Sequence, residues 1–229
     1  MKFAIATLAA SISLATSAQA VTTVTFEAAG AQTTSVALTT AIETFDTQPT
    51  GNPVTTVNTS FNAIGVSAVF STTQILAADQ YGGAGGTGNQ VTVRDTGDLV
   101  IDFTGTPLTY FGVWASALDA ANTVSFYKGG NLLSSTNLTA FALPGGYNGN
   151  PTTLFFGQNG GENYAFFNFL VSETYDRVVL SQNGGGGFEL DNVTIGTAAV
   201  PEPATWAMLI AGFGLVGAVA RRRNAAVAA

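Results

Sequence analysis

The chain has 229 residues, a formal net charge of −7, and neither cysteine nor histidine. The absence of these two residue types excludes disulfides, thiol nucleophiles, histidine-based zinc sites and Ser-His-Asp triads. Between residues 21 and 199 there are 13 acidic and 3 basic side chains, and such a surface repels phosphate backbones, so nucleic acid is not an expected partner.

Residues 1–20 have the pattern of a secretory signal peptide. Met1 and Lys2 give a positive start, residues 3–14 are largely apolar, and residues 17–20 end in a small-x-small cleavage pattern. We therefore expect cleavage after Ala20 and an extracytoplasmic domain over residues 21–196. A retained N-terminal anchor is the alternative.

The sequence between the two ends predicts an all-β body. Leu99, Ile101 and Phe103 share one face of a strand with period-2 alternation. Similar patterns predict strands at 21–26, 64–70, 91–93, 99–103, 110–115, 123–128, 153–156, 164–171, 177–181 and 187–195. Gly129 and Gly130 indicate a hairpin turn. Many short strands separated by Gly and Asn favour an antiparallel β-sandwich of jelly-roll type.

Carboxylates are the only side chains of the body that suit catalysis. A glycosidase needs two of them, about 5–10 Å apart, one with a raised pKa. The candidates are Asp119, Glu162, Glu173 and Glu189, but nothing in the sequence distinguishes them from surface acids. We expect a protein that is not an enzyme, and a glycosidase with paired carboxylates stays an alternative.

The last predicted strand changes its apolar phase. Phe188 and Leu190 share one face, whereas Val193 and Ile195 have the opposite parity. A β-bulge at Asp191-Asn192 would reconcile the two halves, and bulges often redirect side chains at sites.

This strand resembles the terminal Asp-Asn/Asp-Val strand of β-sandwich surface proteins and carbohydrate-binding modules. In some of those modules the Asp helps to hold a structural calcium with an acid from the first strands. By that resemblance Glu27, Asp46 and Asp191 are candidate ligands of Ca²⁺, which prefers oxygen. The alternative is that Asp191 and Asn192 only stabilise a turn through side-chain hydrogen bonds.

Tyr110 and Trp114 lie on the same face of one predicted strand. Aromatic rings that carry a polar group offer a platform on which a sugar can stack. These two side chains are therefore candidate glycan contacts, and the alternative is that both belong to the core.

The C-terminal end is a compact pattern of Pro201-Glu202-Pro203, Trp206, an apolar run to Ala220, and Arg221-Arg222-Arg223. A helix over residues 206–220 reaches roughly 22 Å, which is short for a hydrocarbon core of about 30 Å. Trp206 and the arginines extend its reach because they can lie at opposite interfaces. We expect a transmembrane helix at 206–220, a linker at 197–200 and a cytoplasmic end at 224–229. A buried C-terminal helix is the alternative.

Residues 201–223 resemble a PEP-CTERM sorting domain of the Trp-Ala type, which is also named after the C-terminal domain of ice-binding proteins. The resemblance implies a Gram-negative bacterium that makes exopolysaccharide. It also implies an exosortase, a membrane transpeptidase-like cysteine protease, which processes the tail near residues 201–203 and delivers the body to the cell surface or extracellular matrix. We expect a non-catalytic protein associated with exopolysaccharide or biofilm. A carbohydrate-active enzyme and a passive adhesive protein without a specific ligand remain alternatives.

Overall fold

The computed structural model describes residues 20–36, 39–94, 97–184, 186–197 and 213. The predicted signal peptide and transmembrane helix lie outside these ranges, apart from Ala20 and Phe213. Within the described ranges, no helix is long and apolar enough to cross a membrane.

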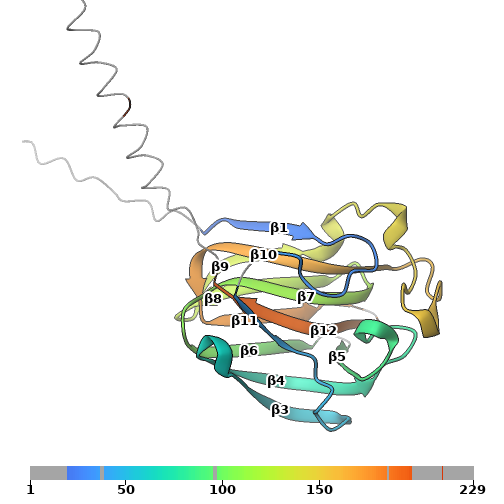
Figure 1. The fold of residues 1–229 in the computed structure, drawn as a ribbon, viewed down its shortest axis with the longest axis horizontal. Helices are drawn as coiled ribbons and strands as arrows, with labels where there is room; N and C mark the ends of the chain where they lie inside the picture. The colour runs from blue at the N-terminus through green and yellow to red at the C-terminus, as the bar shows by residue number, and fades with distance from the viewer. Residues whose placement is uncertain (1–19, 37–38, 95–96, 185, 198–212, 214–229) are drawn as a thin grey trace, which may run out of the picture.

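Strands make up most of the described body (Figure 1). They are β1 (Thr22–Phe26), β2 (Thr40–Glu43), β3 (Gly51–Phe61), β4 (Val66–Ala77), β5 (Asn89–Arg94), β6 (Asp98–Gly105), β7 (Leu108–Leu118), β8 (Asn122–Lys128), β9 (Asn131–Asn137), β10 (Asn163–Tyr175), β11 (Arg177–Gln182) and β12 (Gly187–Gly196). Short 3-10 helices lie between them: η1 (Asn62–Ile64), η2 (Ala84–Gly86), η3 (Leu138–Ala140), η4 (Gly145–Tyr147) and η5 (Thr153–Phe155).

The strands form one antiparallel sheet that folds over on itself. Their order is β1-β10-β7-β12-β5-β4-β6-β11-β8-β9, with β2 beside β12 and β3 beside β4. A hydrogen bond between the hydroxyls of Thr22 and Ser134 links β1 to β9, the two ends of this order. The two halves therefore enclose a core between them, which confirms the prediction of an all-β, antiparallel β-sandwich.

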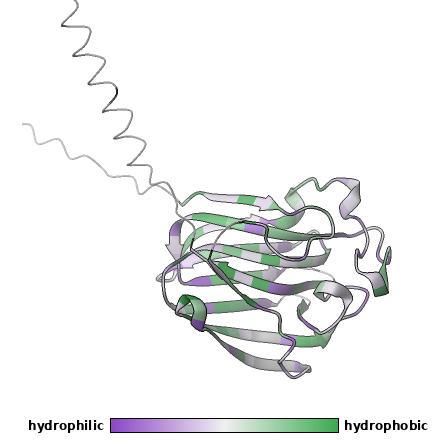
Figure 2. Cartoon of the chain, viewed as in Figure 1, coloured by the Kyte–Doolittle hydropathy of each residue, from purple (hydrophilic) through white to green (hydrophobic). Residues whose placement is uncertain are grey.

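Aromatic side chains hold the two halves together. The ring of Phe126 on β8 lies 5.9 Å from that of Phe111 on β7 and 5.5 Å from that of Phe169 on β10. It also contacts Tyr175 edge to face at 5.2 Å. All four side chains are buried. Figure 2 shows the matching pattern along the strands, where hydrophobic and polar residues alternate.

Two local predictions are confirmed. The β8–β9 hairpin turns at Gly129 and Gly130, whose φ angles are 54° and 81°, as a type I′ turn requires. In β12, Asp191 is paired with Trp114 and Thr194 with Gly112, so three residue steps face two on β7. Asn192 takes a positive φ of 50° at this bulge.

The strand predicted at 153–156 is wrong, because this segment curls into η5. Oδ1 of Asn150 accepts hydrogen bonds from the backbone N–H and the hydroxyl of Thr152, and this local bonding favours a turn. Leu154 and Phe156 then point outward and are 65% and 79% exposed.

Three strands, β2, β3 and β9, were not predicted from the sequence. β3 and β9 each pair with a single neighbour, and their sequences are rich in Thr, Ser and Asn. Edge strands bury few side chains, so the apolar alternation that marks a strand is weak in them.

β1 begins and β12 ends at the same side of the molecule, on the left in Figure 1. The loops that precede β5 and β10 lie at the opposite end. The C-terminal segment of the chain therefore follows one end of the sandwich, and the long loops gather at the other.

Candidate functional site

The sheet formed by β10, β7, β12 and β5 has a second side chain layer, on its face away from the core. Side chains alternate along a strand, so Phe167 and Phe169 enter the core while Tyr164 and Phe166 point the other way. Tyr164 and Phe166 form a small buried cluster with Trp114 and Ala117.

Two loops cover this outer face. Gln80, between β4 and β5, presents its carbonyl oxygen to the hydroxyl of Tyr164 and to the side-chain amides of Asn150 and Asn159, at 2.9 to 3.0 Å. Because all three bonds converge on one carbonyl, the loop before β5 and the loop before β10 are held as a unit.

A cavity of about 340 Å³ opens beside these loops. It contains three carboxylates and one guanidinium, and we call it the acidic pocket. Its lining residues are Tyr81, Arg94, Ala117, Asp119, Glu162, Gly186, Gly187 and Glu189. Its volume lies at the lower end of the range for small-molecule sites.

Local backbone geometry brings the three acids to this cavity. Glu189 lies near the start of β12, and Asp119 follows a bulge at Ala117, whose φ is 45°. Asn159 adopts a φ of 54°, and its carbonyl accepts the N–H of Glu162 at 3.0 Å, which closes the turn that precedes β10.

Two glycines leave room for the carboxylates. A Cβ on Gly186 would lie 2.0 Å from Oδ2 of Asp119, and a Cβ on Gly187 would lie 2.1 Å from Oε1 of Glu189. Gly186 also has a φ of +78°, which disfavours any residue with a side chain. The glycine run before β12 is thus part of the pocket.

The acids of the pocket are partly desolvated. Burial raises the pKa of Glu189 to about 8; a hydrogen bond to its own backbone and the charge of Arg94 lower it, while the charges of Asp79 and Asp119 raise it. Burial also raises the pKa of Glu162, and the charge of Asp119 adds to this effect. Glu189 is only 9% exposed, and surroundings of low polarity disfavour the charged carboxylate, so the side chain keeps its proton to a higher pH.

Among the side chains that the structure describes, one carboxylate oxygen in the pocket lacks a donor, and another accepts a long hydrogen bond. Oε2 of Glu162 is buried and has no hydrogen-bond partner among the described residues. Oδ2 of Asp119 accepts one bond, from Nε2 of Gln182 at 3.3 Å. The pocket therefore offers acceptors for hydroxyl or ammonium groups, and it holds a pair of carboxyls with raised pKa.

The predicted calcium ligands lie apart and each stabilises a loop. Glu27 accepts hydrogen bonds from Ser35 and Asn168; burial by itself would raise the pKa of Glu27, but these bonds lower it. Asp46 accepts the N–H of Asn89 at 2.9 Å.

Asp191 accepts the N–H groups of Ala84 and Asn192 at 2.7 and 2.6 Å. Asp191 therefore stabilises a turn through hydrogen bonds, which is the alternative to calcium binding that the sequence left open. Among the residues that the structure describes, no three acidic side chains gather closely enough to hold a metal ion, so Glu27, Asp46 and Asp191 do not form a joint site.

The predicted glycan contacts, Tyr110 and Trp114, are both buried. The hydroxyl of Tyr110 donates to Oδ1 of Asn168 at 2.7 Å, and Trp114 packs against Tyr164. Neither ring presents a face to a glycan, which corrects that interpretation in favour of the core alternative. Ala84, in the loop before β5, packs against the cluster that contains Trp114, and the sequence pattern did not reveal this cover.

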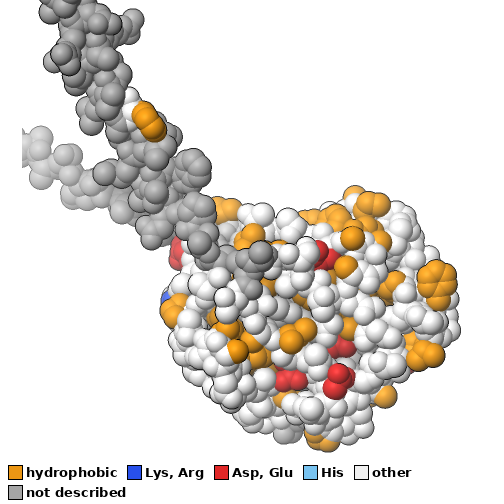
Figure 3. Space-filling model, in the orientation of Figure 1, with side chains coloured by type: hydrophobic (Ala, Val, Ile, Leu, Met, Phe, Trp, Pro, Cys, Tyr) orange, Lys and Arg blue, Asp and Glu red, His pale blue; other side chains and the backbone are white. Residues whose placement is uncertain are grey.

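Exposed aromatic and large apolar side chains lie elsewhere, in residues that were not predicted as contacts. Tyr81 lines the acidic pocket and is 45% exposed, and Leu154 and Phe156 project from the loop before β10. Figure 3 shows hydrophobic side chains at the right-hand edge, where this loop lies in Figure 1. Large apolar residues within a Gly- and Asn-rich segment were the available signal, but we interpreted them as a strand.

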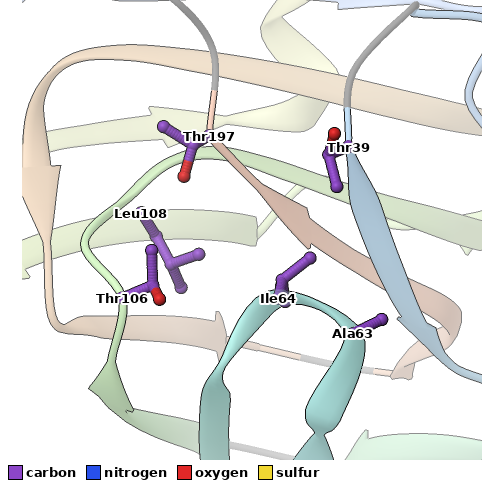
Figure 4. Close-up of a pocket in the computed structure, with 6 residues that line it drawn as sticks. All are labelled: Thr39, Ala63, Ile64, Thr106, Leu108 and Thr197. Carbon is purple, nitrogen blue, oxygen red and sulfur yellow. The ribbon is translucent and has the colours of Figure 1, made fainter.

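A second cavity, of about 170 Å³, lies at the other end of the body, where β12 ends (Figure 4). It is lined by Thr39, Ala63, Ile64, Thr106, Leu108 and Thr197. None of these six side chains is ionisable, so this cavity offers hydroxyl and apolar contacts but no acid–base chemistry.

Residues 199–223 match the family model of the PEP-CTERM protein-sorting motif. No curated protein matches the chain. The match confirms the resemblance of the tail, and it supports export and exosortase-dependent sorting to the surface or extracellular space. It covers the tail and not the sandwich, so the sandwich's ligand must be argued from its own residues.

Proposed function

We propose that this chain with a PEP-CTERM tail is a cell-surface or extracellular-matrix protein that associates with exopolysaccharide and is not a catalyst. The sorting motif at residues 199–223 is the single observation that carries the proposal. In this proposal the apolar segment at 206–220 anchors the chain in the membrane for a time, and the exosortase then acts near residues 201–203.

The arrangement of the body supports contact with a polymer outside the cell. The acidic pocket lies near the start of β12, and the tail follows its end. From Glu189 to Gly196 a strand extends about 23 Å at roughly 3.3 Å per residue. An anchored chain therefore presents the pocket away from the membrane, with the ring of Tyr81 beside the carboxylates. Such a combination of ring and acceptor is suited to sugars.

Mass spectrometry of the mature C-terminus tests the sorting step. We expect a terminus near residues 201–203 in cells that have the exosortase, and an intact tail in cells that lack it. Replacement of Pro201, Glu202 and Pro203 by Ala should also leave the tail intact. Equal processing with and without the enzyme would contradict the proposal.

Co-sedimentation with the host's exopolysaccharide tests the association. The mature protein should pellet with the polymer and stay in solution without it. A protein that stays in solution in both cases would instead support the passive adhesive alternative.

One observation favours a second candidate, glycoside hydrolysis. Asp119, Glu162 and Glu189, three of the four carboxylates considered for this reaction, line one cavity, and the raised pKa of Glu189 suits a general acid. This candidate predicts the release of reducing ends from the polymer and their loss in Glu189→Gln. Binding without release keeps the non-catalytic proposal.

A further inference from the structure

We propose that the acidic pocket binds a protonated primary amine, carried by an amino sugar of the polysaccharide. This inference deepens the proposed association with exopolysaccharide and rests on it. It names the chemical group that distinguishes the ligand, a positively charged nitrogen with three N–H donors.

The first argument is the state of the acceptors. Glu189 is nine-tenths buried and lines the cavity, and this burial raises the pKa of its carboxyl group to about 8. Oε2 of Glu162, on the facing loop, is buried without any partner in the described ranges. A buried carboxylate oxygen that lacks a donor is costly, so Oε2 of Glu162 is prepared for a donor that arrives with a ligand beside Glu189.

The second argument is charge. Asp119, Glu162 and Glu189 line the cavity, Asp79 is near enough to influence Glu189, and Arg94 is the opposing cation. Arg94 makes no ion pair with another described residue. The acids repel one another more than the single guanidinium compensates, and a cation in the cavity would relieve this repulsion.

An ammonium group fits this arrangement better than a metal ion. Ca²⁺ needs six to eight oxygens at about 2.3–2.6 Å, and no three acids in the described part of the chain are that close together. An ammonium group binds at hydrogen-bond distances of about 2.7–3.2 Å and has at most three donors, so it can bind with fewer carboxylates than Ca²⁺ requires.

The remaining walls fit a sugar ring. Tyr81 and Ala117 add apolar surface to the cavity, and about 340 Å³ is enough for a small ligand. A fully acetylated sugar would leave the like charges uncompensated. The amine is therefore the feature that we expect the pocket to select.

Calorimetry on the full chain in detergent tests the inference, with glucosamine oligomers and their N-acetylated counterparts as probes. We expect heat of binding with the amine and none with the acetylated oligomer. Glu189→Gln and Glu162→Gln should each weaken binding by about tenfold or more, because each removes a charge-assisted hydrogen bond. Glu173→Gln, at an exposed position of β10, is the matched control and should bind as the wild type does.

Proton release gives an independent reading. An ammonium favours the ionised form of Glu189, so binding at pH 6, where the amine of the probe still carries its own proton, should release protons. The groups that act on Glu189 are Asp79 and Asp119, which oppose its ionisation, and Arg94, which favours it. Tyr164, whose pKa burial raises above its ordinary value, stays neutral at this pH.

Three results would overturn the inference. They are equal binding of the acetylated oligomer, unchanged binding in both pocket variants, and preference for a lysine peptide over the amino sugar. Co-sedimentation separates this failure from that of the proposed function. If the protein pellets with the polymer but ignores the amine, only the inference fails; if it binds the amine but does not pellet, the proposed association fails.

Discussion

Glu189→Gln should flatten the dependence of folding stability on pH. Glu189 has an ordinary pKa of 4.5, and burial raises it to about 8 in the folded protein. Between these two values the folded state holds a proton that the unfolded state has lost. The free energy of unfolding therefore falls as pH rises through this window, and the loss is complete above the folded pKa.

The magnitude follows from the size of the shift. At about 1.4 kcal/mol per pKa unit, full ionisation of Glu189 costs up to roughly 5 kcal/mol. Water that enters the open pocket reduces this figure, so we expect about 2–5 kcal/mol. Asp191, whose pKa burial raises from 3.8 to about 7, contributes a second loss of similar size. The Gln variant should thus keep roughly half of the wild-type pH dependence.

Urea unfolding at pH 5 and pH 9 measures this effect, with the fluorescence of buried Trp114 as the probe. Gln has nearly the shape of a protonated Glu, so the variant should match the wild type closely at pH 5 and exceed its stability at pH 9. Glu173→Gln should behave as the wild type does. The same loss of stability in Glu189→Gln and in the wild type would refute the reasoning.

Three further predictions concern the sandwich. Phe126→Ala should lower the free energy of unfolding by about 3–5 kcal/mol, because the ring is fully buried between both halves. Urea titration measures this loss, and a value below about 1 kcal/mol would contradict the central place of Phe126 in the core. Gly130→Ala should cost about 1–2 kcal/mol through its φ of +81° alone, since no atom lies near the added Cβ, and an unchanged midpoint would exclude this strain. EDTA should leave the melting temperature unchanged, because Glu27, Asp46 and Asp191 do not converge. Scanning calorimetry measures this temperature, and a lower value with EDTA would restore the calcium hypothesis.

Much of the fold could be predicted because the side chains of a strand point alternately to its two faces, and this alternation is visible in the sequence. Phe167 and Phe169 alternate with Tyr164 and Phe166, and the phase change around Asp191 marked the bulge. The edge strands show no such clear alternation, since they bury few side chains. The segment 153–156 was misleading because its apolar residues face solvent, where their hydropathy does not report on a core.

The candidate site could be predicted only as a set of residue types. Asp119, Glu162, Glu173 and Glu189 were equivalent in sequence, but the pairing of β7 with β10 and β12 brings three of them to one cavity. Glu173 lies toward the far end of β10 and remains exposed. The buried positions of Tyr110 and Trp114 likewise depend on partners that are distant in sequence, Asn168 and Tyr164 on β10.

The sequence by itself indicates how this protein is sorted, whereas its tertiary structure decides which side chains it presents to a ligand. A sorting tail is recognised as a contiguous run of proline, acid, aromatic, apolar and basic residues, and local order in the chain is sufficient for that. The pocket depends on the strand order β10-β7-β12-β5, which joins residues up to about a hundred positions apart. Burial raises the pKa of Glu189, and Oε2 of Glu162 is buried without a partner in the described part of the chain. Burial is a property of the packed sandwich rather than of any single segment.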